Sequence, residues 1–342
     1  MKKDYFTESD IHYSRLCEKM LEELPYWARD YYNELRIRRY SSSTIYQYIN
    51  NLLRFLRYFH DGAFSEYELN TLPAAMMEKL TYSDLMEYLS SQYLSDSSAA
   101  QQRQAMATIR SFYAYLQRYG FITSNPSSSL ITPREKDNNS DKLRVIDSSV
   151  LPDILAQVYN FSGLSGQTKA KREKTADRDF AIIVLLLGTG IRVSELVGLD
   201  MRNVNFYDAY VQVYRKGGHV DEAYFGSTVE KALRQYIDRC RPALVKEETG
   251  DALFLSLQGT RLTVRSVEKM VKKYAIEAGY PKGFMVSPHR FRATFATDLY
   301  NRTGDIALVA DALHHVSIDT TKRHYAVASV DHKRSEERRV GK

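Results

Sequence analysis

The sequence predicts a mainly α-helical protein with a small β-sheet, divided into two domains. Three observations lead to this prediction. Apolar residues recur at helical spacing over most of the chain, one short section alternates as β-strands do, and a stretch poor in apolar residues separates two helical regions. A chain of 342 residues is also long enough for two domains, each with its own core.

The first helical region, residues 24–123, is predicted to form a small bundle. One strong helix lies in residues 44–60, where these apolar residues recur every three or four positions: Ile45, Ile49, Leu52, Leu56 and Phe59. Its N-cap is expected among Ser42, Ser43 and Thr44. A second helix over residues 99–120, expected to end at Gly120, carries this apolar stripe: Met106, Ile109, Tyr113 and Leu116. Residues 1–23 are set apart as an N-terminal extension.

Residues 124–145 are predicted to be a linker, because they are rich in Ser, Asn, Pro and charge and offer little to bury. The second domain is predicted over residues 146–333. It contains helices and a β-rich section, residues 203–226, in which Lys216-Gly217-Gly218 supplies a hairpin turn. Residues 334–342, RSEERRVGK, resemble the translation of a sequencing-adapter read. They are excluded from the fold prediction as an adapter scar.

The composition narrows the class of protein. A net charge of +6 permits a nucleic-acid partner without requiring one. The longest apolar run, residues 180–188, is about half the roughly 20 residues of a membrane-spanning helix, so no membrane partner is expected. Cys17 and Cys240 are too few for a disulfide framework or a metal cluster, which fits a reducing cytosol, and no secretory signal opens the chain. No cofactor or metal is predicted.

Four separated clusters contain residues that could act in catalysis, and each also has a structural interpretation. Arg192 and Glu195 are three residues apart, a spacing typical of a surface ion pair. However, Arg192 directly follows a strongly apolar helix, where an arginine calls for an anionic partner. Lys216 lies at a hairpin tip, where a lysine usually serves solubility. A flexible ammonium there can also enter a DNA groove or protonate a leaving oxygen.

His289 and Arg292 lie one helical turn apart, just after the helix-start signal Ser287-Pro288. The first turn of a helix favours an anion such as phosphate, although a solvated helix end explains the pattern equally well. Farther along, His315 and Tyr325 are ten residues apart. A lone tyrosine usually serves packing, and its pKa near 10 makes it a poor nucleophile unless cationic neighbours favour the phenolate.

Together the four clusters suit phosphoryl transfer without a metal. Two guanidinium groups can neutralise the charge on the equatorial oxygens of a phosphodiester, while a tyrosine attacks in line. A lysine can protonate the leaving 5′ oxygen.

These motifs resemble those of tyrosine recombinases of the phage integrase and Xer class, over residues 25 to 332. TGIRVSEL resembles the family's first arginine box, RKGG its β-hairpin lysine, HRFRATFAT its HxxR box, and ALHHVSIDTTKRHYA its segment that ends in the nucleophile. The resemblance assigns the catalytic roles to six residues: Arg192, Lys216, His289, Arg292, His315 and Tyr325. Glu195 is assigned a supporting role.

The resemblance further implies an N-terminal helical core-binding bundle (SAM-like) and a C-terminal α+β catalytic domain, which close around duplex DNA. It implies cleavage through a 3′-phosphotyrosine and a Holliday junction, by a homotetramer on two DNA sites with a dimer at each. Accessory DNA-bending proteins are further expected partners, and the expected location is the cytoplasm, in a bacterial or phage-encoded protein associated with the nucleoid. The role is integration or excision of a mobile element, or Xer-type resolution. Candidate DNA contacts are Arg36, Arg38, Arg39, Arg54, Arg57, Arg103, Arg110 and His219.

The chain departs from the family pattern at several points. His314 replaces a glycine, His219 replaces a second lysine, and the acids Asp221 and Glu222 stand where a basic residue is expected, which predicts a weaker DNA contact there. Residues 162–174 read as a basic loop, either solvated or in contact with DNA.

Three alternative functions stay open. A type IB topoisomerase would use the same covalent chemistry to relax DNA, and the topology of the product separates the two. A non-catalytic DNA-binding regulator would have no use for Tyr325 and Lys216. The third alternative is a small-molecule enzyme or a scaffold, and no cofactor motif in the sequence supports it.

Overall fold

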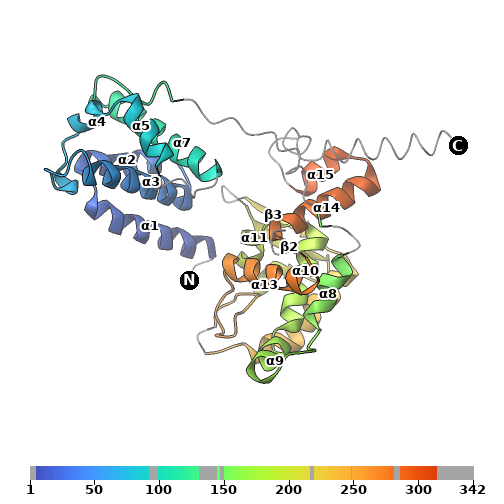
Figure 1. Cartoon of the computed structure of the whole chain (residues 1–342). Coiled ribbons are helices and arrows are strands. Elements are labelled where there is room, and N and C mark those ends of the chain that lie inside the picture. Colours follow the sequence, from blue (N-terminus) through green and yellow to red (C-terminus); the bar gives the residue numbers. More distant parts are fainter. Residues whose placement is uncertain are drawn as a thin grey trace. The chain divides into compact units, whose positions relative to one another are not determined.

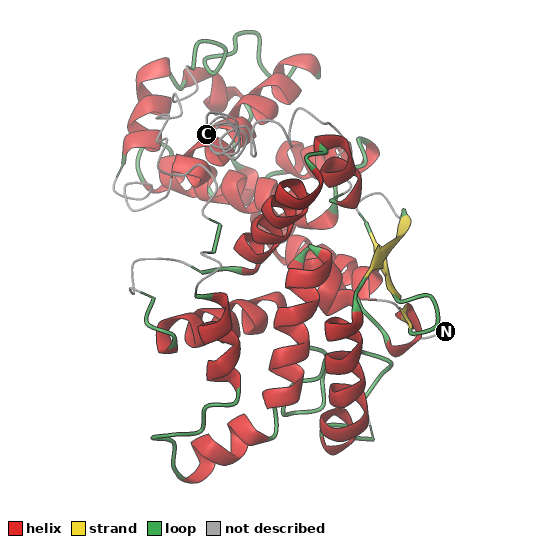
Figure 2. Ribbon diagram, turned by 90° about the vertical axis from the view of Figure 1, so that its right-hand side faces the viewer, coloured by secondary structure: helices red, strands yellow, loops and turns green. Residues whose placement is uncertain are grey.

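The computed structural model describes residues 5–91, 99–130, 145–146, 150–215, 219–247, 249–280 and 286–313. The chain divides into two compact units, Met1–Asp137 and Asn138–Lys342, and each is described by itself. Helices predominate, and the only sheet among the described residues is small (Figure 2). The predicted fold class, mainly α with a small sheet, is therefore confirmed.

The first unit is a helical bundle (Figure 1). Its elements are α1 (Tyr5–Glu23), α2 (Tyr26–Ile37), α3 (Ser42–Asp61), the short 3-10 helix η1 (Leu69–Thr71), α4 (Ala75–Lys79), α5 (Tyr82–Ser90) and α7 (Ala99–Arg118). Helix α3 is central and contacts α1, α2 and α7. Both predicted apolar stripes, on α3 and α7, are buried. The N-cap of α3 is Ser41, one residue before the predicted range, and its Oγ accepts the Thr44 N–H at 3.3 Å.

The range set apart as an extension contributes α1, which packs on α3. Cys17 is buried in the core of the bundle, with Met20 and Leu21 partly buried against it. Together with buried Leu24, these residues have the spacing of one helical face. Residues 1–23 are therefore a structural part of the bundle as far as they are described.

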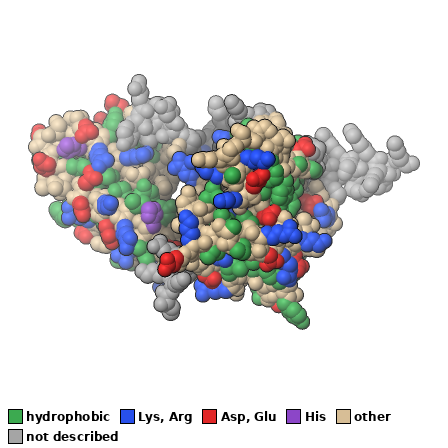
Figure 3. Space-filling view, turned by 90° about the horizontal axis from the view of Figure 1, so that it is seen from below, with side chains coloured by type: hydrophobic (Ala, Val, Ile, Leu, Met, Phe, Trp, Pro, Cys, Tyr) green, Lys and Arg blue, Asp and Glu red, His purple; other side chains and the backbone are tan. Residues whose placement is uncertain are grey.

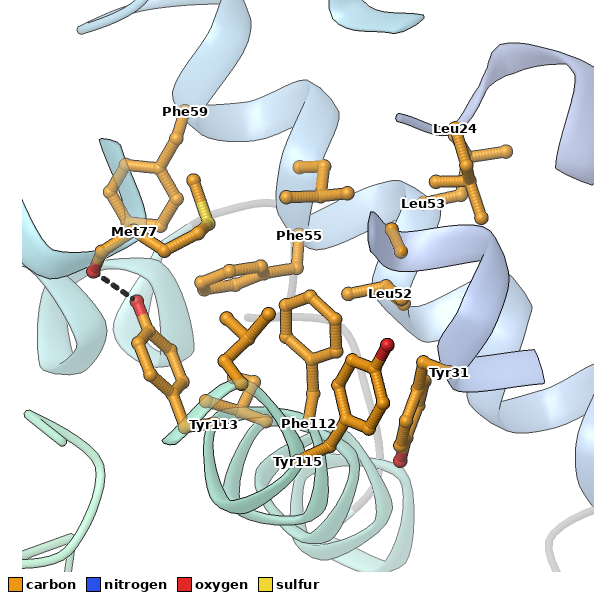
Figure 4. Close-up of a cluster of buried hydrophobic side chains, with 14 of the residues drawn as sticks. Leu24, Tyr31, Leu52, Leu53, Phe55, Phe59, Met77, Phe112, Tyr113 and Tyr115 are labelled. Atoms are coloured by element: carbon orange, nitrogen blue, oxygen red, sulfur yellow. Dashed lines mark hydrogen bonds between the residues drawn. The ribbon is translucent and has the colours of Figure 1, made fainter. Parts of the chain in front are cut away.

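The core of the bundle is rich in aromatic side chains (Figure 4). Phe112 lies at its centre, with its ring 5.8 Å from that of Trp27 and 5.3 Å from that of Tyr31. The polar atoms of the buried aromatics have acceptors: the Trp27 indole N–H donates to the Leu72 carbonyl at 2.8 Å and the Tyr113 hydroxyl to the Met77 carbonyl at 3.0 Å. Burial of these large side chains therefore leaves no unpaired donor at either position.

The first residues of the predicted linker pack on the bundle. One carboxylate oxygen of Glu78 accepts the backbone N–H groups of Thr123 and Ser124 at 2.9 and 2.8 Å, and both hydroxyls as well. Farther on, Leu130 is buried in the bundle core. Residues 124–130 thus pack on the bundle, residue 145 belongs to the second unit, and residues 131–144 lie outside the described residues.

The second unit surrounds a buried helix, α10 (Ala176–Thr189), which contacts α8, α12 and α14. The other helical elements are α8 (Leu151–Val158), α9 (Gly166–Glu173), α11 (Val193–Gly198), η3 (Met201–Asn203), α12 (Ser227–Gln235), the π-helical turn η4 (Tyr236–Cys240), η5 (Arg241–Ala243), α13 (Val264–Glu277), α14 (Pro288–Thr303) and α15 (Ile306–Ala312). No described helix is both long enough and apolar enough to cross a bilayer.

The sheet is antiparallel in the order β1 (Val204–Asn205), β2 (Tyr210–Tyr214) and β3 (Val220–Tyr224). Val211 and Val213 of β2 and Ala223 of β3 are buried, so this face packs inward. The predicted hairpin is formed by β2 and β3, and residues 216–218 of its turn lie outside the described residues.

The expectation of a loop at residues 162–174 is wrong for most of that range, because residues 166–173 form α9. Arg172 is buried, pairs with Glu277 of α13, and lies over the Tyr274 ring at 5.0 Å. These contacts with α13 stabilise α9, and they could not be predicted from the short basic sequence of the helix alone.

Candidate active site

Arg192 and Glu195 form the first part of the candidate site. Arg192 is the N-cap of α11, and its backbone N–H donates to Glu195 Oε2 at 2.7 Å. Its Nη1 donates to Glu195 Oε1 at 2.9 Å. The Arg192 side chain is 44% exposed and that of Glu195 only 4%. The predicted ion pair exists, but its acid is buried. Glu195 therefore binds Arg192 from the protein interior, while the guanidinium remains partly exposed to solvent.

Gly190 joins this pair to a second arginine that follows 100 residues later. It ends α10 in the left-handed conformation, with φ +62°, and a Cβ at this position would lie 2.4 Å from a ring carbon of Phe295. Its carbonyl accepts Nη1 of Arg292 at 2.5 Å. The tight turn therefore presents Arg192 and at the same time binds Arg292.

Arg292 of α14 is buried, and its Nη2 donates to the Leu313 carbonyl at 2.6 Å. Leu313 caps α15 and precedes His314 and His315 directly. Arg292 thus fastens the end of α15 to the turn at Gly190 through a charge-assisted fork. His289 lies one turn before Arg292, in the first turn of α14, and is exposed.

Three of the six predicted catalytic residues, Lys216, His315 and Tyr325, lie outside the described residues, as does His314. The structure brings Arg192 and Arg292 together through Gly190 and places His289 on the helix of Arg292. Among the described residues, no group of three or more His, Cys, Asp or Glu side chains could hold a metal ion.

Sequence reasoning missed Arg215, which directly follows β2. Its side chain is 9% exposed, with Nη1 3.3 Å from Glu195 Oε1 and Nε 2.9 Å from Asp221 Oδ2. Asp221, noted as an acid where a base was expected, therefore serves as a partner within the fold. For Asp221 the signal was available, because an arginine and an aspartate beside the turn of one hairpin can pair across its two strands.

A second missed residue, Arg261, supports α11 from its C-terminal end. Its Nη1 donates to the carbonyls of Val197 and Leu199, both at 2.9 Å, and its Nη2 pairs with Asp200. A cation at these carbonyls completes the end of a very short helix and so helps to fix the element that carries Glu195.

The candidate DNA contacts differ in how they are held. Arg57 pairs with Glu23, and Arg38 pairs with Glu34 at 3.5 Å, so the charge of each is partly compensated. The other exposed candidates are Arg36, Arg39, Arg54 and His219, and the half-buried ones are Arg103 and Arg110. Basic and acidic side chains are interspersed on the face shown in Figure 3, so charge alone does not outline a binding surface on that face.

Comparison with known proteins covers both units. The sequence profile of the phage integrase family matches residues 157–332, and that of the phage integrase N-terminal SAM-like domain matches residues 27–119. Tyrosine recombinase XerD of Oceanobacillus iheyensis is 31% identical over 303 residues, which cover 87% of this chain and 93% of the relative.

Two solved structures show the same fold. The Tn1549 transposon integrase in complex with circular intermediate DNA matches with a TM-score of 0.63 at 20% identity, over 92% of this chain and 99% of that one. The XerH site-specific recombinase bound to difH substrate matches with a TM-score of 0.61 at 22% identity, over 84% and 78%. On the strength of both profiles and of the XerD relative, the chain belongs to the phage integrase family and is a tyrosine recombinase.

Proposed function

We propose that this enzyme is a site-specific DNA recombinase that cuts and rejoins duplex strands through a 3′-phosphotyrosine link at Tyr325. The observation that carries the proposal is the junction at Gly190, which unites Arg192 and Arg292 although they lie far apart in the sequence. The Arg292 guanidinium is bound to the turn that leads into Arg192, and two arginines held at one turn suit a phosphodiester whose charge grows in the transition state. The names of the XerH and Tn1549 structures, a recombinase and an integrase with DNA, support the same function.

In this proposal each residue has a separate task. Arg192 and Arg292 neutralise the non-bridging oxygens, with His289 and His315 as further hydrogen-bond donors. Tyr325 attacks phosphorus as the phenolate, after its proton has passed to solvent, the bond to the 5′ oxygen breaks, and Lys216 gives that oxygen its proton. Attack by a 5′ hydroxyl of the partner strand then releases Tyr325 and restores a phosphodiester. The energy of the broken bond is kept in the protein–DNA link, so the cycle needs neither ATP nor a metal.

The assembly follows from the exchange of strands between two duplexes. We propose a homotetramer on two DNA sites, a dimer at each, with a Holliday junction as the intermediate. The exposed candidate contacts, Arg36, Arg39, Arg54 and His219 first among them, supply phosphate contacts. The role is integration or excision of a mobile element, or resolution of the Xer type, in the cytoplasm and with accessory DNA-bending proteins.

Covalent trapping tests the proposal. Duplexes that bind the full-length protein are first enriched from a random pool, and the enriched sequence is rebuilt with a nick so that cleavage becomes irreversible. After denaturation we expect a DNA-linked protein band with the wild type and none with Tyr325→Phe. Tyr207→Phe is the matched control, because Tyr207 belongs to the same unit and is 96% exposed, and this variant should retain the band.

The two variants separate the possible outcomes. A band that persists in Tyr325→Phe would show that another residue is the nucleophile. Absence of a band from the wild type on DNA that it binds would contradict the catalytic proposal and favour a DNA-binding regulator. Relaxation of a supercoiled plasmid without recombinant product would favour the topoisomerase chemistry.

A further inference from the structure

Arg215 lies at the junction between the sheet and the candidate site. It follows β2 directly, its backbone N–H donates to the His219 carbonyl at 2.8 Å, and α11 packs against β2. The side chain turns inward, where it is 9% exposed. A guanidinium that is withdrawn from water to this degree needs anionic partners within the fold.

Two carboxylates hold Arg215. Its Nη1 lies 3.3 Å from Glu195 Oε1 on α11, and its Nε lies 2.9 Å from Asp221 Oδ2 on β3. Asp221 also accepts the backbone N–H of Glu222 on its other oxygen at 2.9 Å, which fixes the carboxylate. Arg215 therefore ties both strands of the hairpin, beside its turn, to α11, the helix capped by Arg192.

Glu195 is shared between the two arginines. Its Oε1 accepts from Arg192 at 2.9 Å and from Arg215 at 3.3 Å, while its Oε2 accepts the Arg192 backbone N–H. With both oxygens occupied in this way, Glu195 does not close a two-pronged pair on the Arg192 guanidinium. Among the described residues, Glu195 is the only hydrogen-bond partner of that guanidinium, and 44% of the side chain stays exposed.

We propose that Arg215 is a positioning residue of the recombinase reaction, which orients Arg192 through Glu195. Asp221 balances the charge of Arg215, so that Glu195 can serve Arg192. If Arg215 is removed, Glu195 is released to take both edges of the Arg192 guanidinium, and Arg192 turns away from the phosphate. This inference rests on the proposed function, since it concerns the rate of the covalent step.

The test measures that rate in single turnover on the nicked duplex enriched for the full-length protein, together with DNA affinity. We expect Arg215→Met to slow formation of the covalent complex by about ten- to a hundredfold, the effect of a misplaced transition-state contact. DNA affinity should change less than about threefold, because a buried side chain contributes little to phosphate binding. Arg302→Met, which removes an arginine that is 74% exposed on α14, is the control and should match the wild type.

Two double variants decide whether Arg215 acts through Arg192. In an Arg192→Lys background, Arg215→Met should cost less than about threefold, because the group that it orients is gone. In a Lys216→Ala background, it should cost its full factor. Equal costs in both backgrounds, or the smaller cost in the Lys216 background, would overturn the proposal.

Milder variants keep the test decisive if Arg215→Met fails to fold. Arg215→Lys retains the charge without the planar fork and should recover part of the rate, and Asp221→Asn should lose less than Arg215→Met. Wild-type rates in all three variants would overturn the inference while the proposed function stands. A wild type that forms no covalent complex would contradict the proposed function itself.

Discussion

Glu195 is a buried carboxylate that accepts three hydrogen bonds, two of them from guanidinium groups. We expect Glu195→Gln to lower the free energy of unfolding of the second unit by about 3 kcal/mol, because Arg215 then keeps its buried charge with one carboxylate fewer. Urea unfolding followed by circular dichroism measures the change. Glu230→Gln, which breaks a half-exposed pair with Arg234, is the control and should cost less than about 1 kcal/mol. Equal losses of unfolding free energy in the two variants would mean that burial of the Glu195 ion pairs does not increase their contribution to stability.

The two cysteines provide a second prediction for single residues. Burial raises the pKa of the Cys17 thiol to about 11 and has the same effect on Cys240. At pH 8 only about one thiol in a thousand is then ionised, and the thiolate is the reactive form. We expect both to react with iodoacetamide far more slowly than a free thiol, and at the free rate in concentrated urea. Rapid labelling of the folded protein would show that one thiol reaches solvent.

The residues that carry local patterns were predictable, and those held by long-range contacts were not. Spacing alone paired Arg192 with Glu195, since both lie within one helical turn. The hydrogen bond from Arg292 to the Gly190 carbonyl joins positions 102 residues apart, and no local pattern encodes it. For Arg215, the hairpin register indicates Asp221 as a partner, but Glu195 lies on α11 and no local pattern relates it to Arg215.

At the scale of elements, Glu78 connects α4 to the end of the bundle. Hydrogen bonds from the Thr123 hydroxyl and from the backbone of Ser124 and Thr123 lower the pKa of its carboxyl to about 2. Because the folded-state value lies below the unfolded one, near 4.5, the stabilisation is present above about pH 4.5 and is lost as the pH falls toward 2.

Glu78→Gln should therefore lower the melting temperature of the bundle at pH 7, and the difference from the wild type should shrink as the pH falls from 4.5 to 3. Thermal melts of both proteins across this range measure the effect. The control is Glu87→Gln on α5, which removes a carboxylate for which no hydrogen bond is described. This variant should leave the melting temperature unchanged at every pH. A Glu78→Gln difference independent of pH would indicate lost packing instead of lost charge.

Elements with strong periodicity were predicted well. Helices α3 and α7 bury the stripes read from the sequence, because each stripe is apolar for several turns. Helix α1 was left out, since Cys17, Met20 and Leu21 mark its inner face among many charged residues. Helix α9 was read as a loop because its support comes from α13, and the start of α3 was misplaced within four consecutive hydroxyl residues.

At the scale of the whole molecule, the core cluster of the first unit consists, among the described residues, of side chains from residues 17–130. We expect Phe112→Ala to destabilise that unit by about 3 to 5 kcal/mol, because a large ring is removed from the centre of an aromatic core. The transition of the second unit should stay where it is. Differential scanning calorimetry measures both, with Phe180→Ala in α10, half-buried in the second unit, as the reciprocal variant. A shift of both transitions with either variant would show that the units unfold as one.

The position of Trp27 allows unfolding of the first unit to be followed by fluorescence. It is the only tryptophan among 342 residues, it is fully buried, and its indole N–H is bonded to the Leu72 carbonyl. Fluorescence excited selectively at tryptophan therefore arises from the first unit alone, and the second unit contributes no tryptophan emission. Fluorescence thus reports one half of the recombinase without a dye, and comparison with circular dichroism resolves which half responds first to denaturant, temperature or DNA.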